Sequence, residues 1–70
     1  MDRTSVSSSN LASVGYELGT RTLEVEFSHG GVYQYLNVPL SIYEELMSAS
    51  SHGSYFDQHV KKSWLFLSQD

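Results

Sequence analysis

The chain has 70 residues, with eight acidic side chains against four basic ones, a formal net charge of −4 and no cysteine. A chain this short buries only about 60% of its unfolded surface, so we expect a single small domain with a thin core. The lack of cysteine excludes disulfides and thiolate metal sites. The net negative charge disfavours anionic membranes and opposes long-range attraction to nucleic acid.

The chain carries none of the sequence signals for membrane insertion or export. No apolar run approaches the roughly 20 residues that span a bilayer, and the polar, serine-rich start of the chain differs from a signal peptide. We therefore expect a soluble cytoplasmic protein. Residues 1–10 are predicted to be a loose polar arm or the lead-in to a first strand, residues 11–67 a single domain and residues 68–70 a tail.

Alternation of apolar and polar residues predicts two strands, at residues 11–18 and 21–27. Their apolar positions are Ala12, Val14, Tyr16 and Leu18, then Leu23, Val25 and Phe27. A type II′ turn at residues 19–20 pairs Val14 with Val25 and Ala12 with Phe27, so that all these side chains share one face. A four-residue loop over residues 18–21 keeps the same register, so the predicted hairpin does not depend on which turn forms.

A third strand is predicted at residues 32–37, and the length of the preceding turn decides which face its tyrosines occupy. A two-residue turn pairs Phe27 with Val32, which puts Gln34 on the apolar face and both tyrosines on the glutamate face. A three-residue turn over residues 29–31 pairs Phe27 with Tyr33 and puts the tyrosines on the apolar face. We expect the longer turn, because glycine supplies the left-handed residue it needs and no amide is then buried without partners.

Two helices are predicted after Pro39, which cannot donate to a sheet ladder and so ends the third strand. The first covers residues 41–49, where Ser41 and Glu44 form a capping box. The second covers residues 54–62, with Lys61 and Lys62 in its last turn. The predicted fold is therefore α+β, a three-stranded antiparallel meander covered on one face by two amphipathic helices, with its other face in water.

Five stretches of the sequence, in their order and spacing, resemble one known family. They are SSNLASVGYE, LEVEF, GGVYQYLNVP, IYEEL and SSHGSYFDQHV. The most specific parts are Val14-Gly15-Tyr16, Tyr33-x-Tyr35 with Val38-Pro39, and Gly53-x-Tyr55-Phe56. In these motifs the chain resembles the KTSC domain over about residues 6–64. That family is named for a C-terminal extension of some lysyl-tRNA synthetases, and the resemblance implies a connection with RNA by analogy.

The sequence contains no recognisable catalytic constellation. There is no cysteine nucleophile and no serine in a nucleophile-elbow motif. His29 lies in a predicted turn and Gly53 interrupts any helix between His52 and His59, so three or four converging metal ligands are not indicated. A chain of this size also has little room for the pocket of about 300 Å³ or more that small ligands fill. We therefore expect a non-enzymatic protein without cofactor or metal.

The C-terminal segment is the main candidate for a contact surface. A thin core cannot bury every apolar side chain of residues 64–67, so this segment is expected to form either a short strand at the sheet edge or an exposed apolar patch. We expect a binding module that acts by protein–protein contact through Trp64, Leu65 and Phe66, as a regulator docking on nucleic-acid machinery. The acidic sheet face is a second candidate surface, and the expected state is a monomer or weak dimer.

The alternative function is direct binding of single-stranded RNA or tRNA. Single-strand binders stack bases on aromatic side chains beside a cationic groove. The residues that would do this are Tyr33, Tyr35, Lys61, Lys62 and Arg21. Stacking needs exposed tyrosines, whereas the expected turn places both rings in the core with their hydroxyls at its rim.

Overall fold

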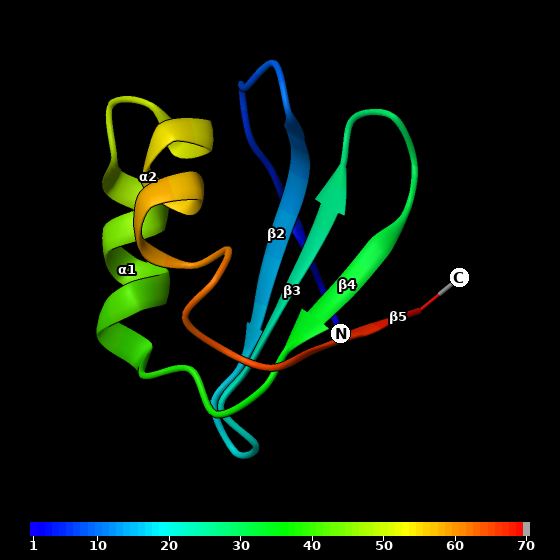
Figure 1. The fold of residues 1–70 in the computed structure, drawn as a ribbon, viewed down its shortest axis with the longest axis vertical. Helices are drawn as coiled ribbons and strands as arrows, with labels where there is room; N and C mark the ends of the chain where they lie inside the picture. Colours follow the sequence, from blue (N-terminus) through cyan, green and yellow to red (C-terminus); the bar gives the residue numbers. More distant parts are fainter. Residues whose placement is uncertain (70) are drawn as a thin grey trace.

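The structure is a computed structural model that describes residues 1–69, which form one five-stranded antiparallel sheet and two helices (Figure 1). The strands are β1 (Thr4–Ser5), β2 (Leu11–Glu17), β3 (Thr22–Phe27), β4 (Val32–Tyr35) and β5 (Phe66–Ser68), and the helices are α1 (Leu40–Ser48) and α2 (His52–His59). The strands lie side by side in chain order, β1 to β5. The α+β class is confirmed, and the predicted meander is extended by one short strand at each edge.

The two edge strands come from the ends of the chain. In β1, Thr4 pairs with Val14 and Ser5 with Ser13, so residues 1–10 contribute a strand as well as a polar lead-in. In β5, Phe66 pairs with Tyr35, so the predicted C-terminal edge strand is present at residues 66–68 instead of 64–67. Two residues of backbone pairing leave no apolar alternation in the sequence, and for that reason β1 was not anticipated.

The β2–β3 hairpin has the predicted register near its turn and a bulge at its far end. Val14 lies opposite Val25, and Glu17 and Thr22 close a four-residue loop. The left-handed residue of that loop is Arg21 (φ 56°), not Gly19, so the predicted type II′ turn is wrong. The register shifts at Ala12, which puts Leu11 instead of Ala12 opposite Phe27 and buries the larger leucine.

The β3–β4 turn places both tyrosines on the apolar face, as predicted. The Phe27 amide donates to the Gly31 carbonyl over 3.0 Å, so the turn contains three residues, 28–30, one position earlier than expected. Gly30 and Gly31 both have positive φ, 101° and 85°. The predicted partners are therefore wrong by two residues, and Tyr33 lies opposite Val25 instead of Phe27.

The core lies between the inner face of the sheet and the two helices (Figure 1). Among residues 1–69, nine hydrophobic side chains are buried there: Leu11, Val14, Leu23, Val25, Tyr35, Val38, Leu46, Phe56 and Val60. The β4 tyrosine motif thus supplies one core residue, Tyr35, and one ring packed against the core, Tyr33. The helices stand over the β2 side of the sheet, and the β4–β5 side extends beyond them (Figure 1).

Both helices begin earlier than predicted. Pro39 is the residue before α1, extended at φ −63° and ψ 147°, and its carbonyl accepts from the Ile42 amide over 3.0 Å. The helix therefore starts before Ser41, so the predicted capping box with Glu44 does not form. In α2 the Ser51 side chain caps the helix by accepting from the Ser54 amide.

The end of α2 also differs from the prediction. Gly53 lies inside the helix, which closes at His59, and Lys61 and Lys62 follow it in a turn. The predicted placement of both lysines in the last helical turn is therefore wrong, because α2 starts two residues earlier than predicted and ends at His59.

The outer face of the sheet is partly covered by the N-terminal strap, which we define as residues 1–6. A Cβ atom added to Gly15 would lie 2.5 Å from the Asp2 carbonyl oxygen, so the strap passes directly over β2. Ser13 and Glu24 on this face are only 7% exposed. The prediction that the whole outer face is in water is therefore wrong.

Candidate functional site

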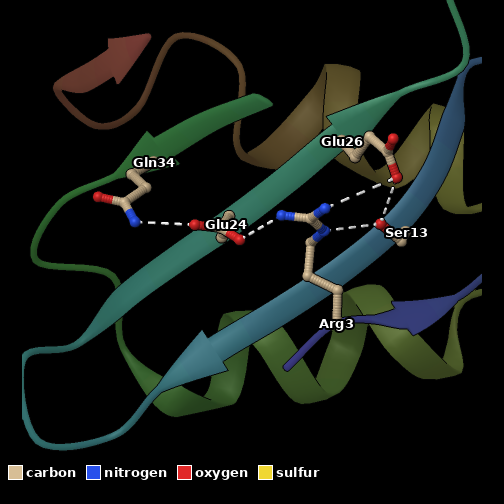
Figure 2. A network of polar contacts seen from close by, with 5 residues as sticks. All are labelled: Arg3, Ser13, Glu24, Glu26 and Gln34. Atoms are coloured by element: carbon tan, nitrogen blue, oxygen red, sulfur yellow. Dashed lines mark hydrogen bonds and ion pairs between the residues drawn. The ribbon is translucent and has the colours of Figure 1, made fainter. Parts of the chain in front are cut away.

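A polar network on the outer face joins the strap to three strands of the sheet (Figure 2). Arg3 Nε donates to Ser13 Oγ over 2.9 Å, and the guanidinium forms an ion pair with Glu24. The other Glu24 oxygen accepts from the Gln34 amide over 2.8 Å. Ser13 also donates to Glu26, whose carboxylate lies 4.0 Å from Arg3.

The Glu24 carboxylate is the electrostatic centre of this network. Burial by itself raises its pKa, but the hydrogen bonds from Gln34 and Arg3 and the charge of Arg3 together lower the pKa below its ordinary value. The carboxylate is therefore ionised and fully engaged. The outer face consequently offers fewer available acidic groups than the sequence predicts, and its network serves to hold the strap in place.

An open groove of about 520 Å³ lies on the inner face, beside α2. Its floor and walls come from β3, β4, β5 and α2, with the turn after α2 at its rim. The volume contradicts our expectation that so small a chain has little room for a pocket of this size. The reason is that the helices cover only part of the sheet, so the β4–β5 side of the inner face is left open (Figure 1).

Five aromatic rings line this groove and form a closed circuit of contacts. The circuit runs Phe27, Phe56, Tyr35, Phe66, Tyr33 and back to Phe27. The ring centroids of neighbours are 5.4–5.5 Å apart, and four of the five contacts are edge-on or steeply inclined. We call this set the aromatic circuit.

The members of the aromatic circuit differ in how far they are accessible. Phe56 and Tyr35 are 3% and 4% exposed and act as its base, whereas Phe66 on the edge strand is 48% exposed. Burial, followed by the proximity of Tyr33, raises the pKa of Tyr35. The phenol at the base of the groove is therefore neutral at physiological pH, and the groove presents an apolar, aromatic surface.

Charged side chains lie only at the rim of the groove. Lys61, Lys62 and Asp57 line it, and all three are exposed. Neither lysine has an ion-pair partner among residues 1–69, in contrast to Arg3. Two positive charges against one negative give the rim a local charge of +1, opposite in sign to the chain as a whole.

The groove unites residues from both predicted sites. From the proposed RNA-binding set it brings together Tyr33, Tyr35, Lys61 and Lys62, and from the proposed protein-contact set it takes Phe66. Arg21 is not part of it, since that residue lies in the β2–β3 turn, where its carbonyl accepts from the Val38 amide.

The other two residues of the predicted protein-contact set, Trp64 and Leu65, directly precede Phe66 in the chain and do not line the groove. Trp64 is partly buried and packs against the core, while Leu65 is 74% exposed. Leu67, which pairs with Gln34 and so lies on the outer face, is 51% exposed.

Among the groove residues that the sequence reasoning missed as members of a site are Phe27, His29 and Phe56. The sequence analysis assigned Phe27 to a strand, His29 to a turn and Phe56 to the apolar face of a helix. What these three residues share is their position at one end of the inner face of the sheet. Only the register of β3, β4 and β5 and the packing of α2 against these strands reveal it.

The histidines take separate structural positions. The His52 ring pairs through Nδ1 with the Leu46 carbonyl over 2.8 Å, and His59 stacks on Tyr55. His29 contacts Phe27 at the end of the groove. Across residues 1–69, no three side chains of the His, Cys, Asp or Glu type gather in a way that could hold a metal ion. None of the helices in that range has the length and apolar character needed to cross a membrane.

The structure is that of a small α+β domain built on an antiparallel sheet, with an open groove on its inner face. The family model of the KTSC domain matches residues 7–64, and the chain belongs to that family. The match covers both helices and the three central strands. No catalytic activity is indicated by the family or by the solved relative described next.

Known proteins similar to the chain include both free-standing domains and parts of larger enzymes. A KTSC domain protein from Yersinia pestis, solved as a crystal structure, superposes with a TM-score of 0.92 at 42% identity, covering 94% of this chain and 93% of that one. An uncharacterised protein of Stutzerimonas stutzeri is 43% identical over 61 residues, which are 87% of this chain and 86% of that protein.

A lysine–tRNA ligase of Trichormus variabilis is 50% identical over 46 residues. These are 66% of this chain but 8% of the ligase, so the similarity concerns one small part of that enzyme.

Proposed function

We propose that the domain is a non-enzymatic binding module that docks on a protein partner through its C-terminal segment. The observation that carries the proposal is the exposed run Leu65–Phe66–Leu67, of which Phe66 and Leu67 lie on the edge strand β5 and Leu65 directly precedes it. An edge strand can accept an extended segment of another chain through main-chain hydrogen bonds, while alternate side chains provide specificity. Phe66 and Leu67 point to opposite faces of the sheet, so a docked segment would contact both.

The relatives support a partner that belongs to nucleic-acid machinery. A chain similar to part of several lysine–tRNA ligases is suited to act beside such an enzyme. The Stutzerimonas stutzeri relative, 86% of which is covered by the match, fits a regulator that binds its partner as a separate small protein.

The proposal is tested by removing apolar surface from β5 and the residue before it without changing the core. We expect Leu65→Ser with Leu67→Ser to weaken partner binding at least about tenfold, as the loss of interface anchors does. The matched control is Leu18→Ser with Leu40→Ser, which removes two other exposed leucines, 64% and 40% accessible, far from β5 in the chain. Quantitative mass spectrometry of proteins captured from the native host compares the two variants with the unaltered domain.

Two outcomes would contradict the proposal. One is that both double variants retain the same captured proteins in the same amounts. The other is that the unaltered domain captures none and is a monomer by light scattering.

Direct binding of single-stranded RNA is the second candidate function. It is favoured by one observation, that Tyr33, Lys61 and Lys62 lie at a single groove beside the exposed ring of Phe66. Bases stack on such rings and phosphates pair with such lysines. The net charge of −4 and the burial of Tyr35 count against it.

A salt-dependent titration tests RNA binding. If the groove binds RNA, affinity for a single-stranded oligonucleotide falls steeply with salt, and Lys61→Gln with Lys62→Gln reduces both the affinity and the salt slope. Arg21→Gln, which removes a cation outside the groove, serves as the control. Absence of binding even at low salt ends this candidate.

A further inference from the structure

The aromatic circuit is poorly explained by folding alone. A core phenylalanine or tyrosine contributes most when it is buried, yet Phe66 keeps about half of its surface in water while completing the circuit. Because the Phe66 ring is half exposed while the rings of Tyr35 and Phe56 are nearly buried, the aromatic circuit forms a concave surface that is open to solvent. The groove volume of about 520 Å³ lies within the range of sites that accept a small ligand or a large side chain.

The shape of the circuit favours a planar aromatic occupant over an aliphatic one. Three of its five contacts have interplanar angles of 77–78°, so neighbouring rings turn edges toward faces. An additional ring entering the groove meets both edges and faces, which is the arrangement that aromatic pairs prefer. An aliphatic group would gain burial but not these oriented contacts.

The charge at the rim favours an anionic occupant over a cationic one. A set of aromatic faces could also hold a cation, as ammonium-binding cages do. Here, however, Lys61 and Lys62 outnumber Asp57 at the groove, and neither lysine is engaged in an ion pair within residues 1–69. A cation would be repelled by this rim, whereas a carboxylate close to the entering ring would be attracted.

We propose that the groove is the anchor pocket for an acidic aromatic segment of a protein partner. In this arrangement an aromatic side chain of the partner enters the aromatic circuit next to Phe66, and a carboxylate on the same segment pairs with Lys61 and Lys62. The assignment rests on the proposed function, since it takes the partner to be a protein docked at β5. Phe66 belongs to both surfaces, because its strand is the sheet edge and its ring lines the groove.

Small probes separate the contributions of the ring and the charge. We would titrate the intact, isotope-labelled domain with N-acetylphenylalanine and follow backbone chemical shifts. The comparison probes are N-acetylphenylalaninamide, which lacks the charge, N-acetylcyclohexylalanine, which lacks the aromatic ring, and phenethylamine, which carries the opposite charge. We expect shifts at the groove residues and the tightest binding for N-acetylphenylalanine, about threefold to tenfold tighter than for the uncharged amide, as two partly exposed ion pairs provide.

Substitutions at the rim and in the circuit give matched controls. Lys61→Gln with Lys62→Gln should abolish the preference for the acid over the amide while leaving amide binding unchanged. Phe66→Ala should weaken both probes. Arg21→Gln, which removes the same charge from the β2–β3 turn, should change neither affinity.

Each contrary outcome overturns the proposal in a recognisable way. Equal binding of acid and amide excludes the role of the lysines, and equal binding of the cyclohexyl probe excludes the role of the circuit. Tighter binding of phenethylamine assigns the groove to a cation instead. Tighter binding of uridine or adenosine 5′-monophosphate at the same residues assigns it to nucleic acid.

The same data distinguish this inference from the proposed function. If Leu65→Ser with Leu67→Ser abolishes partner docking but the probes show no preference, the domain docks on protein without an acidic aromatic anchor. If the probes show the preference but partner docking is unchanged in that double variant, the groove is an anchor pocket and the β5 edge is not the docking surface.

Discussion

Arg3 is the residue through which the outer face of the sheet is closed. Its guanidinium joins Ser13, Glu24 and Glu26, which come from two neighbouring strands, to the strap that crosses them (Figure 2). The Glu24 side chain is only 9% exposed, so its charge has little access to water. Removing one partner of a nearly buried ion pair leaves the other charge poorly compensated, which is more costly than losing an exposed pair.

We predict that Arg3→Gln lowers the free energy of unfolding by about 1–2 kcal/mol at neutral pH. The folded-state pKa of Glu24 is lowered, so its stabilisation is present in full above the ordinary value near 4.5 and is lost as the pH falls through the folded-state pKa. The difference between Arg3→Gln and the unaltered domain should therefore shrink in acid. Urea unfolding at a series of pH values measures it.

Arg21→Gln is the control for this experiment. It removes the same charge from an exposed residue that forms no ion pair within residues 1–69. An equal loss of stability in both variants, or a difference that does not depend on pH, would show that net charge and not the Glu24 pair is responsible.

At the scale of elements, the β3–β4 hairpin shows which features the local sequence predicts and which it leaves open. The face of β4 was predicted from the residues themselves, because a buried Gln34 would have lacked partners. Gln34 in fact bonds Glu24 on the outer face. The partners of β4 were wrong by two residues, because two consecutive positive-φ glycines allow more than one turn with the same parity.

Other features depended on contacts between distant parts of the chain. The strap is held by Arg3, whose role cannot be read from a polar, serine-rich segment. Gly15 was assigned to a strand for its alternation, and only the structure shows the Asp2 backbone packed against it. The groove likewise arises from how far α2 covers the sheet, which periodicity in one helix does not specify.

Gly15→Ala should displace the strap and cost about 1–3 kcal/mol, as overpacking of a close contact does. The added methyl group would meet backbone at 2.5 Å, which a side-chain rotation cannot relieve. Gly19→Ala is the matched control, because its Cβ would lie at an ordinary 3.5 Å from a Glu17 carboxylate oxygen. Chemical unfolding gives the free energies, and amide exchange at β1 and β2 reports the strap directly. Equal effects of the two substitutions would refute the strap's tight contact.

At the scale of the whole molecule, the domain depends on a small core. The expected stability of a 70-residue domain is roughly 4–10 kcal/mol. Nine buried hydrophobic residues must support five strands and two helices, so each carries a large share of that total. Leu46 is the fully buried residue of α1, and the partly buried side chains of the same helix pack against the core around it.

Leu46→Ala should therefore remove about 2–5 kcal/mol, a large part of the whole, and leave a substantial unfolded population at physiological temperature. Leu18→Ala, at a leucine that is 64% exposed, should have little effect on the melting temperature. Thermal unfolding monitored by circular dichroism compares them. A melting temperature of Leu46→Ala close to that of Leu18→Ala would show that α1 is not needed for the cooperative fold.

The course of the strap also determines how the domain can be attached to other objects. Residues 2 and 3 lie on the outer face, whereas the groove opens on the inner face, so a dye, bead or sensor surface joined at the N-terminus leaves the groove facing the solution. An attachment following β5 would instead sit at the groove's own edge. N-terminal immobilisation is therefore the orientation in which binding at the groove is measured without obstruction.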